Sequence, residues 1–252
     1  MRVLVTRPAD QADELQRALS AQGLDPIHVP AVLVEVPAAS PELDAAVAGI
    51  ERYGWVVVTS ANGARAVVEA LNRGRRADVT VGLAAVGEAT ASTLEAAGHR
   101  VRFIATKATA AALADELPIT SGDRVLVARG NLAGSRVADR LRERGAIVDD
   151  VVAYRTIEGP ADSRALLRAA LRDSTPAAVV FASGSAARGL VQLASGEALE
   201  VRSIPAVAIG AETASAAREA GLAAIAVAGS PHAEAVAAAT PEALRESSEA
   251  AR

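Results

Sequence analysis

The residues best suited to chemistry in this sequence stand in short polar turns that directly follow apolar, β-branched runs. Arg7 and Arg129 occupy two of these turns, where a guanidinium can grip a carboxylate or phosphate through two hydrogen bonds. The other turns are small or polar, and each opens a predicted helix whose unpaired N–H groups and dipole favour anions. The predicted ligand-binding residues are Arg7, Ser60, Ala61, Asn62, Gly63, Gly87, Thr90, Arg129, Gly130, Ser183, Gly184, Gly210 and Thr213.

Each of these residues also has a purely structural interpretation. Serine, threonine and glycine are ordinary helix caps. A surface ion pair would equally explain the two arginines. The sequence leaves both interpretations open.

Tyr154 is the candidate for proton transfer. It is one of two tyrosines and lies in an extended segment from Val151 to Ile157. A phenol there can donate a proton or a hydrogen bond to a leaving hydroxyl. The alternative is a half-buried strand tyrosine, placed by its β propensity.

The remaining inventory excludes several kinds of site. The chain has no cysteine, which excludes disulfides, thiolate metal sites and a cysteine nucleophile. Its three histidines stand far apart in sequence, so no histidine metal centre is expected. Neither a GxGxxG turn after a strand, nor a GxxxxGK[ST] loop, nor a GxSxG elbow occurs. We therefore expect a reaction that needs no metal or cofactor.

Composition indicates a globular protein. The chain has 252 residues, of which 51% are hydrophobic and 22% charged. The net charge of -4 provides no general basic surface for nucleic acid. Apolar runs stay below the roughly 18 residues that span a membrane. Because the first strand starts at Arg2, no secretory signal precedes it, and a cytoplasmic location without membrane association is expected.

The elements that carry these turns occur twice. Strand–helix patterns begin at Val3, Trp55 and Leu83, with the first helix expected from Asp10 to Gly23. The run Arg2–Arg7 recurs at Arg124–Arg129. Val57–Ser60 recurs at Val180–Ser183, and Val86-Gly87 recurs at Ile209-Gly210. The repeat predicts two similar α/β domains, each a doubly wound, flavodoxin-like parallel sheet with helices on both faces.

Two extended segments without a following helix suggest how the domains connect. Residues 32–37 and 151–158 fall at equivalent positions of the repeat and would form a two-stranded linker. The first domain would then combine 1–31 with 159–252, and the second would span 38–150. A tandem division near Ile119–Gly122 is the rival. With the domains facing each other, the turns would line one cleft. The tail from Pro241 is either a last helix or a frayed end.

Several motifs in this order and spacing, from residue 2 to about 238, resemble the uroporphyrinogen-III synthase family. They are Val3-Leu4-Val5-Thr6-Arg7-Pro8, Val57-Val58-Thr59-Ser60-Ala61-Asn62-Gly63, Ala85-Val86-Gly87-Glu88-Ala89-Thr90-Ala91, Tyr154-Arg155-Thr156, Phe181-Ala182-Ser183-Gly184-Ser185, Ala208-Ile209-Gly210-Ala211-Glu212-Thr213-Ala214 and Ser230-Pro231.

The resemblance implies two domains joined by a two-stranded linker, the first discontinuous. It also implies closure of hydroxymethylbilane to uroporphyrinogen III, with loss of water, inversion of the last ring and no cofactor. Tyr154 falls on the tyrosine that assists loss of the hydroxyl. Ser60 and Ser183 fall on the family's turn serines, and Thr90 and Thr213 on its turn threonines.

One departure from the family pattern is Gly184, where proline or alanine is common. A glycine there would loosen the start of the helix and weaken the role of Ser183. The protein partner that the resemblance implies is hydroxymethylbilane synthase, in a transient encounter.

Two other functions stay open from the sequence. The chain could be a non-catalytic ligand-binding or regulatory module of the same fold, although the presence of Tyr154 disfavours this. It could also be a periplasmic-type binding protein, which the missing signal peptide disfavours.

Overall fold

A computed structural model describes residues 1–76, 79–172, 174–195, 199–222 and 225–250. The chain divides into two compact units. Unit 1 combines Met1–Leu33 with Ile157–Arg252, and unit 2 is Val34–Thr156. The first strand and helix therefore belong to the same unit as the last third of the chain. Ile119–Gly122, where a tandem division would fall, lies inside unit 2.

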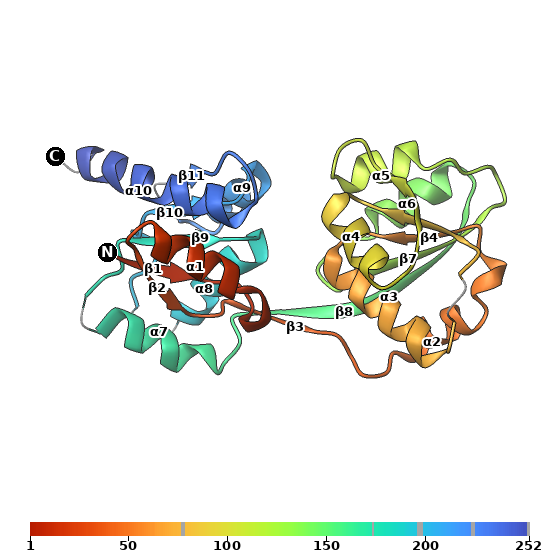
Figure 1. The fold of residues 1–252 in the computed structure, drawn as a ribbon, viewed down its shortest axis with the longest axis horizontal. Helices are drawn as coiled ribbons and strands as arrows, with labels where there is room; N and C mark the ends of the chain where they lie inside the picture. The colour runs from red at the N-terminus through yellow and green to blue at the C-terminus, as the bar shows by residue number, and fades with distance from the viewer. Residues whose placement is uncertain (77–78, 173, 196–198, 223–224, 251–252) are drawn as a thin grey trace. The chain divides into compact units, whose positions relative to one another are not determined.

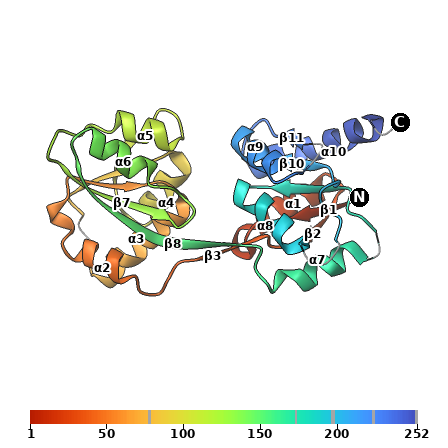
Figure 2. The ribbon, with the colours of Figure 1, turned by 180° about the vertical axis from the view of Figure 1, so that it is seen from behind.

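Unit 1 is built on a five-stranded sheet in the order β11-β10-β9-β1-β2, with every neighbouring pair parallel. The strands are β1 (Arg2–Val5), β2 (Asp25–His28), β9 (Ala178–Phe181), β10 (Ala206–Ala208) and β11 (Ile225–Val227). β1 lies directly beside β9, so the two ends of the chain share one sheet, as the red and cyan strands of Figures 1 and 2 show.

Helices cover both faces of this sheet because successive strand residues point to opposite sides. Val3 and Val5 pack in the core with α1 and α10, whereas Leu4 packs with α7, α8 and α9. The helices are η1 (Ala9–Gln11), α1 (Asp13–Ala21), α7 (Ser163–Arg172), α8 (Gly184–Ala194), α9 (Ala211–Glu219) and α10 (Ala233–Ala250). From Pro241 to Ala250 the tail is thus helical, and the last two residues lie outside the described part of the chain.

Unit 2 holds the second sheet, in the order β3-β8-β7-β4-β5-β6. The strands of this sheet are β3 (Val32–Glu35), β4 (Trp55–Val58), β5 (Gly82–Ala85), β6 (Val101–Ile104), β7 (Arg124–Gly130) and β8 (Ile147–Glu158). The first two residues of β3 and the last two of β8 belong to unit 1. Neighbouring strands from β8 to β6 pair in parallel.

The helices of unit 2 also cover both faces of the sheet. Val56 and Val58 pack with α2, α3 and α4, whereas Val57 packs with α5 and α6. These helices are α2 (Pro41–Ala48), η2 (Ile50–Arg52), α3 (Ala61–Arg73), α4 (Glu88–Ala96), α5 (Ala110–Glu116) and α6 (Arg136–Glu143).

The two sheets have one topology. β2-β1-β9-β10-β11 matches β8-β7-β4-β5-β6 strand for strand, and both have the flavodoxin-like order 2-1-3-4-5. The predicted fold class, two similar doubly wound α/β domains, is confirmed. The repeated sequence thus places equivalent residues at equivalent points of two sheets.

Some elements differ from the sequence prediction. The first helix starts at Asp13, after the short 3₁₀ turn η1, and not at Asp10. The segment predicted as a separate strand from Val151 is the second half of one twelve-residue strand, β8, whose neighbour in the sheet is β3. Within the described ranges, the helices are too short or too polar to cross a membrane.

Candidate functional site

Tyr154 and Ser60 meet at the carboxyl edge of the unit 2 sheet. Ser60 caps α3 by accepting a hydrogen bond from the Gly63 N–H at 3.0 Å, and its own hydroxyl donates to the Tyr154 phenol oxygen at 3.0 Å. Because the phenol oxygen accepts from Ser60, the phenol proton stays available for another acceptor. The first turn of α3 thereby fixes the position of the Tyr154 hydroxyl.

Gly130 leaves the space that the Tyr154 ring occupies. A Cβ built on Gly130 would lie 2.6 Å from Cζ and 2.7 Å from the hydroxyl oxygen of Tyr154, so any side chain there would displace the ring. Asn131 holds the strand that carries the ring: its N–H donates to the Tyr154 carbonyl at 3.1 Å, and its side-chain oxygen accepts from the Thr156 N–H at 2.7 Å. The phenol is therefore held from two sides.

The other tyrosine, Tyr53, has a different environment. Its hydroxyl donates to Asp149 at 2.5 Å and accepts from Arg52 at 2.6 Å. Burial raises the pKa of the Tyr53 phenol above its usual value, and the hydrogen bond to Asp149 adds to that effect. The Tyr53 proton is thus committed to a structural contact, whereas that of Tyr154 is not.

Arg129 is engaged within the protein. Its Nε and Nη2 donate to the two carboxylate oxygens of Asp150 at 2.7 and 3.0 Å, and its Nη1 donates to the Ala133 carbonyl at 2.7 Å. The side chains of Arg129 and Asp150 are 18% and 12% exposed. The ion pair that the sequence left as an alternative for Arg129 is therefore present, and it is largely buried.

Arg7 is the opposite case. Among the described residues its guanidinium has no hydrogen-bonding or ion-pairing partner, and its Nε is buried. Burial lowers the pKa of the Arg7 guanidinium below its usual value, and the negative charge of Glu14 only partly opposes this shift. A buried guanidinium donor without a partner costs free energy, and an anionic ligand would remove that cost.

Ser183 in unit 1 repeats the capping of Ser60. It caps α8 by accepting from the Ala186 N–H at 3.2 Å, and its hydroxyl lies 2.9 Å from that of Ser185. Ser183 makes this capping contact with Gly184 directly after it. A Cβ on Gly184 would lie 2.5 Å from Cβ of Ala216, so glycine lets α8 pack closely against α9.

The two glycine turns leave their helix starts without a side-chain cap. Gly87 precedes α4 and Gly210 precedes α9, both with extended backbone. Thr90 and Thr213, three residues later, are buried. The first-turn N–H groups are suited to anions, although Glu88 and Glu212 in the same turns already complement the helix dipoles.

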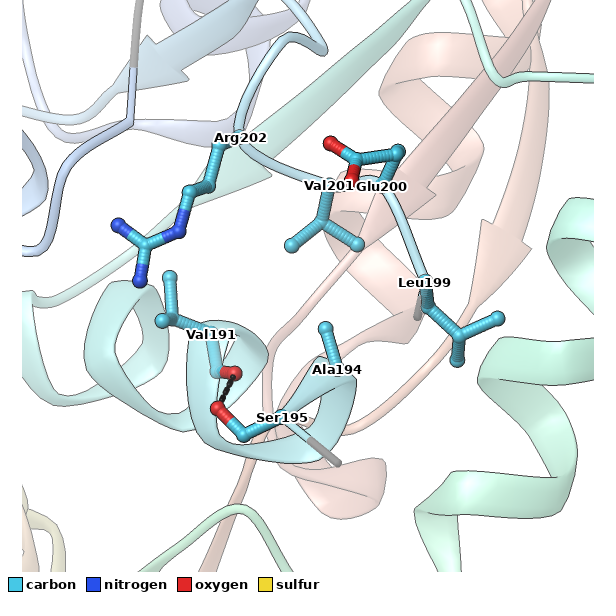
Figure 3. Close-up of a pocket in the computed structure, with 7 residues that line it drawn as sticks. All are labelled: Val191, Ala194, Ser195, Leu199, Glu200, Val201 and Arg202. Atoms are coloured by element: carbon cyan, nitrogen blue, oxygen red, sulfur yellow. Dashed lines mark hydrogen bonds between the residues drawn. The ribbon is translucent and has the colours of Figure 1, made fainter. Parts of the chain in front are cut away.

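Two small cavities lie within the units. One of about 70 Å³ in unit 2 is lined by Thr59, Arg129 and Arg136 among others, at the same sheet edge as Tyr154. The other, about 100 Å³, lies in unit 1 between the end of α8 and the segment before β10, where Ser195 donates to the Val191 carbonyl (Figure 3). The second cavity is at the amino edge of its sheet, away from the predicted turns.

The structure thus brings part of the predicted site together within each unit. In unit 2, Ser60, Gly63, Gly130 and Tyr154 form one cluster, with Ala61 and Asn62 in the same turn of α3. Asn131 and Asp150 were not predicted as supports, since nothing local marks partners that stand 25 and 21 residues away in the chain. The predicted single cleft depends on how the units are placed and stays a prediction.

The chain is similar to known proteins over most of its length. A family model described as uroporphyrinogen-III synthase HemD matches residues 13–238. A putative uroporphyrinogen-III synthase of Archaeoglobus fulgidus is 31% identical over 227 residues, which cover 88% of this chain and 90% of that protein. A uroporphyrinogen-III synthase of Synechococcus elongatus is 32% identical over 156 residues, 60% of this chain and 59% of that protein. A porphyrin biosynthesis protein HemD of Ruminiclostridium josui is 27% identical, and the match spans 44% of its length.

Solved structures show the same fold. A mutant uroporphyrinogen III synthase of the extremely thermophilic bacterium Thermus thermophilus aligns with a TM-score of 0.66 at 23% identity, over 98% of this chain and 99% of that one. A uroporphyrinogen-III synthetase of Helicobacter pylori aligns over the whole of both chains with a TM-score of 0.61 at 18% identity. At these identities the likeness establishes the architecture alone.

Proposed function

The chain belongs to the uroporphyrinogen-III synthase family, and from that premise we propose that it closes linear hydroxymethylbilane to uroporphyrinogen III. A carbon–carbon bond closes the ring, the terminal hydroxyl leaves with one hydrogen as water, and the last pyrrole ring is inverted. The step involves no net oxidation, so it balances without a redox partner.

The observation that carries this proposal is the arrangement around Tyr154. Its phenol oxygen accepts from Ser60 at 3.0 Å, which leaves the phenol proton for the departing hydroxyl. As the proton leaves, the Ser60 donor supports the negative charge that develops on the phenol oxygen. Tyr154 is thus proposed as the acid that assists loss of water.

The substrate carries eight carboxylates, whereas this protein has a net charge of -4. Binding must therefore depend on local donors and not on the overall field. The proposed donors are the first-turn N–H groups of α3, α4, α8 and α9, together with the Arg7 guanidinium. A site of this kind mainly imposes a conformation, so that the substituted carbon of the last ring is the one attacked.

The test uses the purified chain and freshly generated hydroxymethylbilane, with chromatographic separation of the product isomers. Unassisted closure gives the non-inverted type I isomer, so the proposal expects type III product in proportion to protein. Type I alone would leave a non-catalytic ligand-binding module as the better description. The expected encounter with hydroxymethylbilane synthase stays a prediction, which a comparison of coupled and added substrate would test.

Replacing Ser60 by alanine is expected to lower kcat about tenfold with little change in KM, because one hydrogen bond to the phenol is lost. The variant also loses the α3 cap, so its free energy of unfolding should fall by about 1 kcal/mol. Steady-state kinetics and urea unfolding measure the two effects, and Ser60→Thr, which keeps a hydroxyl, should recover most of the rate.

Thr109→Ala is the matched control for this loss. Thr109 caps α5 in the same unit by accepting from the Ala112 N–H at 3.2 Å, and among the described residues no hydrogen bond joins it to Tyr154. Equal losses of stability with a fall in kcat for Ser60→Ala alone would assign Ser60 to positioning the phenol. Equal losses of kcat in both variants would reduce Ser60 to an ordinary cap.

A further inference from the structure

The internal repeat provides two arginines at equivalent positions, and their neighbours differ. Arg7 follows β1 and Arg129 ends the matching part of β7. In the register of the sheets, Val5 pairs with His28 and Val127 pairs with Asp150. His28 in unit 1 therefore stands where Asp150 stands in unit 2, on the strand beside the arginine.

In unit 2 the Arg129 guanidinium is paired with Asp150. Asp150 takes two hydrogen bonds from Arg129, and the pair is mostly buried. The paired charges cancel at short range, and most guanidinium donors are used. A ligand carboxylate would have to displace Asp150 to gain the same contacts.

In unit 1, His28 contacts the Arg7 backbone and does not pair with the Arg7 guanidinium. His28 Nε2 lies 3.0 Å from the Arg7 backbone oxygen and, because a carbonyl can only accept, donates to it. This contact fixes the backbone of Arg7 but offers nothing to the guanidinium, whose Nε stays buried without a partner in the described part of the chain. The charge of Glu14 raises the pKa of the Arg7 guanidinium, but less than burial lowers it.

The position of Arg7 in the sheet suits a ligand. The chain order reverses between β1 and β9, and this switch point is where open α/β sheets bind ligands. The Thr6 hydroxyl ties the two strand ends together by donating to the Val180 carbonyl at 2.7 Å. β9 leads directly into the start of α8, and β1, which Arg7 follows, pairs with β9 in the sheet.

We propose that Arg7 forms a carboxylate subsite in unit 1 and that Arg129, its repeat counterpart, is structural. The two roles differ because unit 1 has His28 at the position where unit 2 has the acid Asp150. In identifying the carboxylate as one of hydroxymethylbilane, this inference rests on the proposed function. It replaces the symmetric expectation that both arginines bind substrate.

His28→Asp is the decisive variant because it rebuilds the acid of unit 2 beside Arg7. We expect it to raise KM for hydroxymethylbilane about tenfold with kcat retained, since the guanidinium becomes paired internally. His28→Asn controls for loss of the ring and should raise KM much less. Arg7→Gln should match His28→Asp in KM, whereas Arg129→Gln should act mainly on thermal stability.

A second measurement is independent of turnover. In NMR spectra, titration with propionate should shift the Arg7 Nε–H resonance of the wild-type protein and leave that of His28→Asp unmoved. A shift in a protein that makes no type III isomer would support the subsite and overturn the proposed function. Type III activity with an unmoved Arg7 resonance, and with KM unaltered in His28→Asp and Arg7→Gln, would overturn the subsite alone.

Discussion

Tyr154→Phe should lower kcat for closure of hydroxymethylbilane by about 100-fold or more, while KM stays within a few-fold of wild type. The variant removes the phenol proton, which the hydrogen bond from Ser60 leaves available, and keeps the ring that packs over Gly130. Because the lost interaction acts in the transition state, the effect should fall on kcat. Steady-state rates with freshly generated substrate, corrected for unassisted type I closure, measure it.

Tyr53→Phe is the matched control, since it removes the other phenol hydroxyl of the chain. Tyr53 bonds to Asp149 and Arg52 at 2.5 and 2.6 Å, so its loss should reduce stability, leaving kcat close to wild type. If Tyr154→Phe turned over at the wild-type rate, the phenol would have no part in proton transfer. Parallel losses of kcat in the two variants would point to damage to unit 2 as a whole.

The central strands could be predicted from sequence because they are apolar on both faces. β1, β4, β5 and β9 are buried by helices on each side, and each reads as an uninterrupted run. The strands that escaped prediction are β2, β6 and β11, which lie at sheet edges. β2 reads Asp-Pro-Ile-His, and a proline is tolerated there because an edge strand can spare an N–H donor.

The candidate site was predictable in position but not in chemistry. Strand–turn–helix order places Ser60 and Ser183 just after the carboxyl ends of β4 and β9, and both serines do cap their helices. The contrast between the two arginines is invisible locally, because Val-Leu-Val-Thr-Arg and Val-Leu-Val-Ala-Arg are nearly the same. The deciding residues, His28 and Asp150, stand on the neighbouring strand and are brought close only by sheet register.

Gly189→Ala should destabilise unit 1 by about 3 kcal/mol. This effect is larger than the loss of about 1 kcal/mol expected for Ser60→Ala at the start of α3. A Cβ on Gly189 would lie 2.0 Å from the Ala31 carbonyl oxygen and 2.9 Å from the Gly159 nitrogen. These are backbone atoms, so no side-chain rotation can relieve the overlap. α8 would have to move away, or the 2.9 Å hydrogen bond from Gly159 N–H to the Ala31 carbonyl would have to break.

Amide hydrogen exchange resolves the effect by unit. Protection should fall across α8 and along the segments at Ala31 and Gly159, whereas the fluorescence transition of Trp55, the single tryptophan, should report unit 2 unfolding as in the wild type. Gly229→Ala, in the same unit with nothing within 4 Å of the added carbon, should change stability by less than about 1 kcal/mol.

Unaltered protection of α8 in Gly189→Ala would show that the close approach is not a constraint on the fold. A loss confined to unit 1 would have a functional consequence as well, because α8 begins at the Ser183 turn beside the Arg7 strand. Displacing that helix should raise KM together with the loss of stability. The contact at Gly189 would then link the segments at Ala31 and Gly159 to the carboxylate subsite proposed at Arg7.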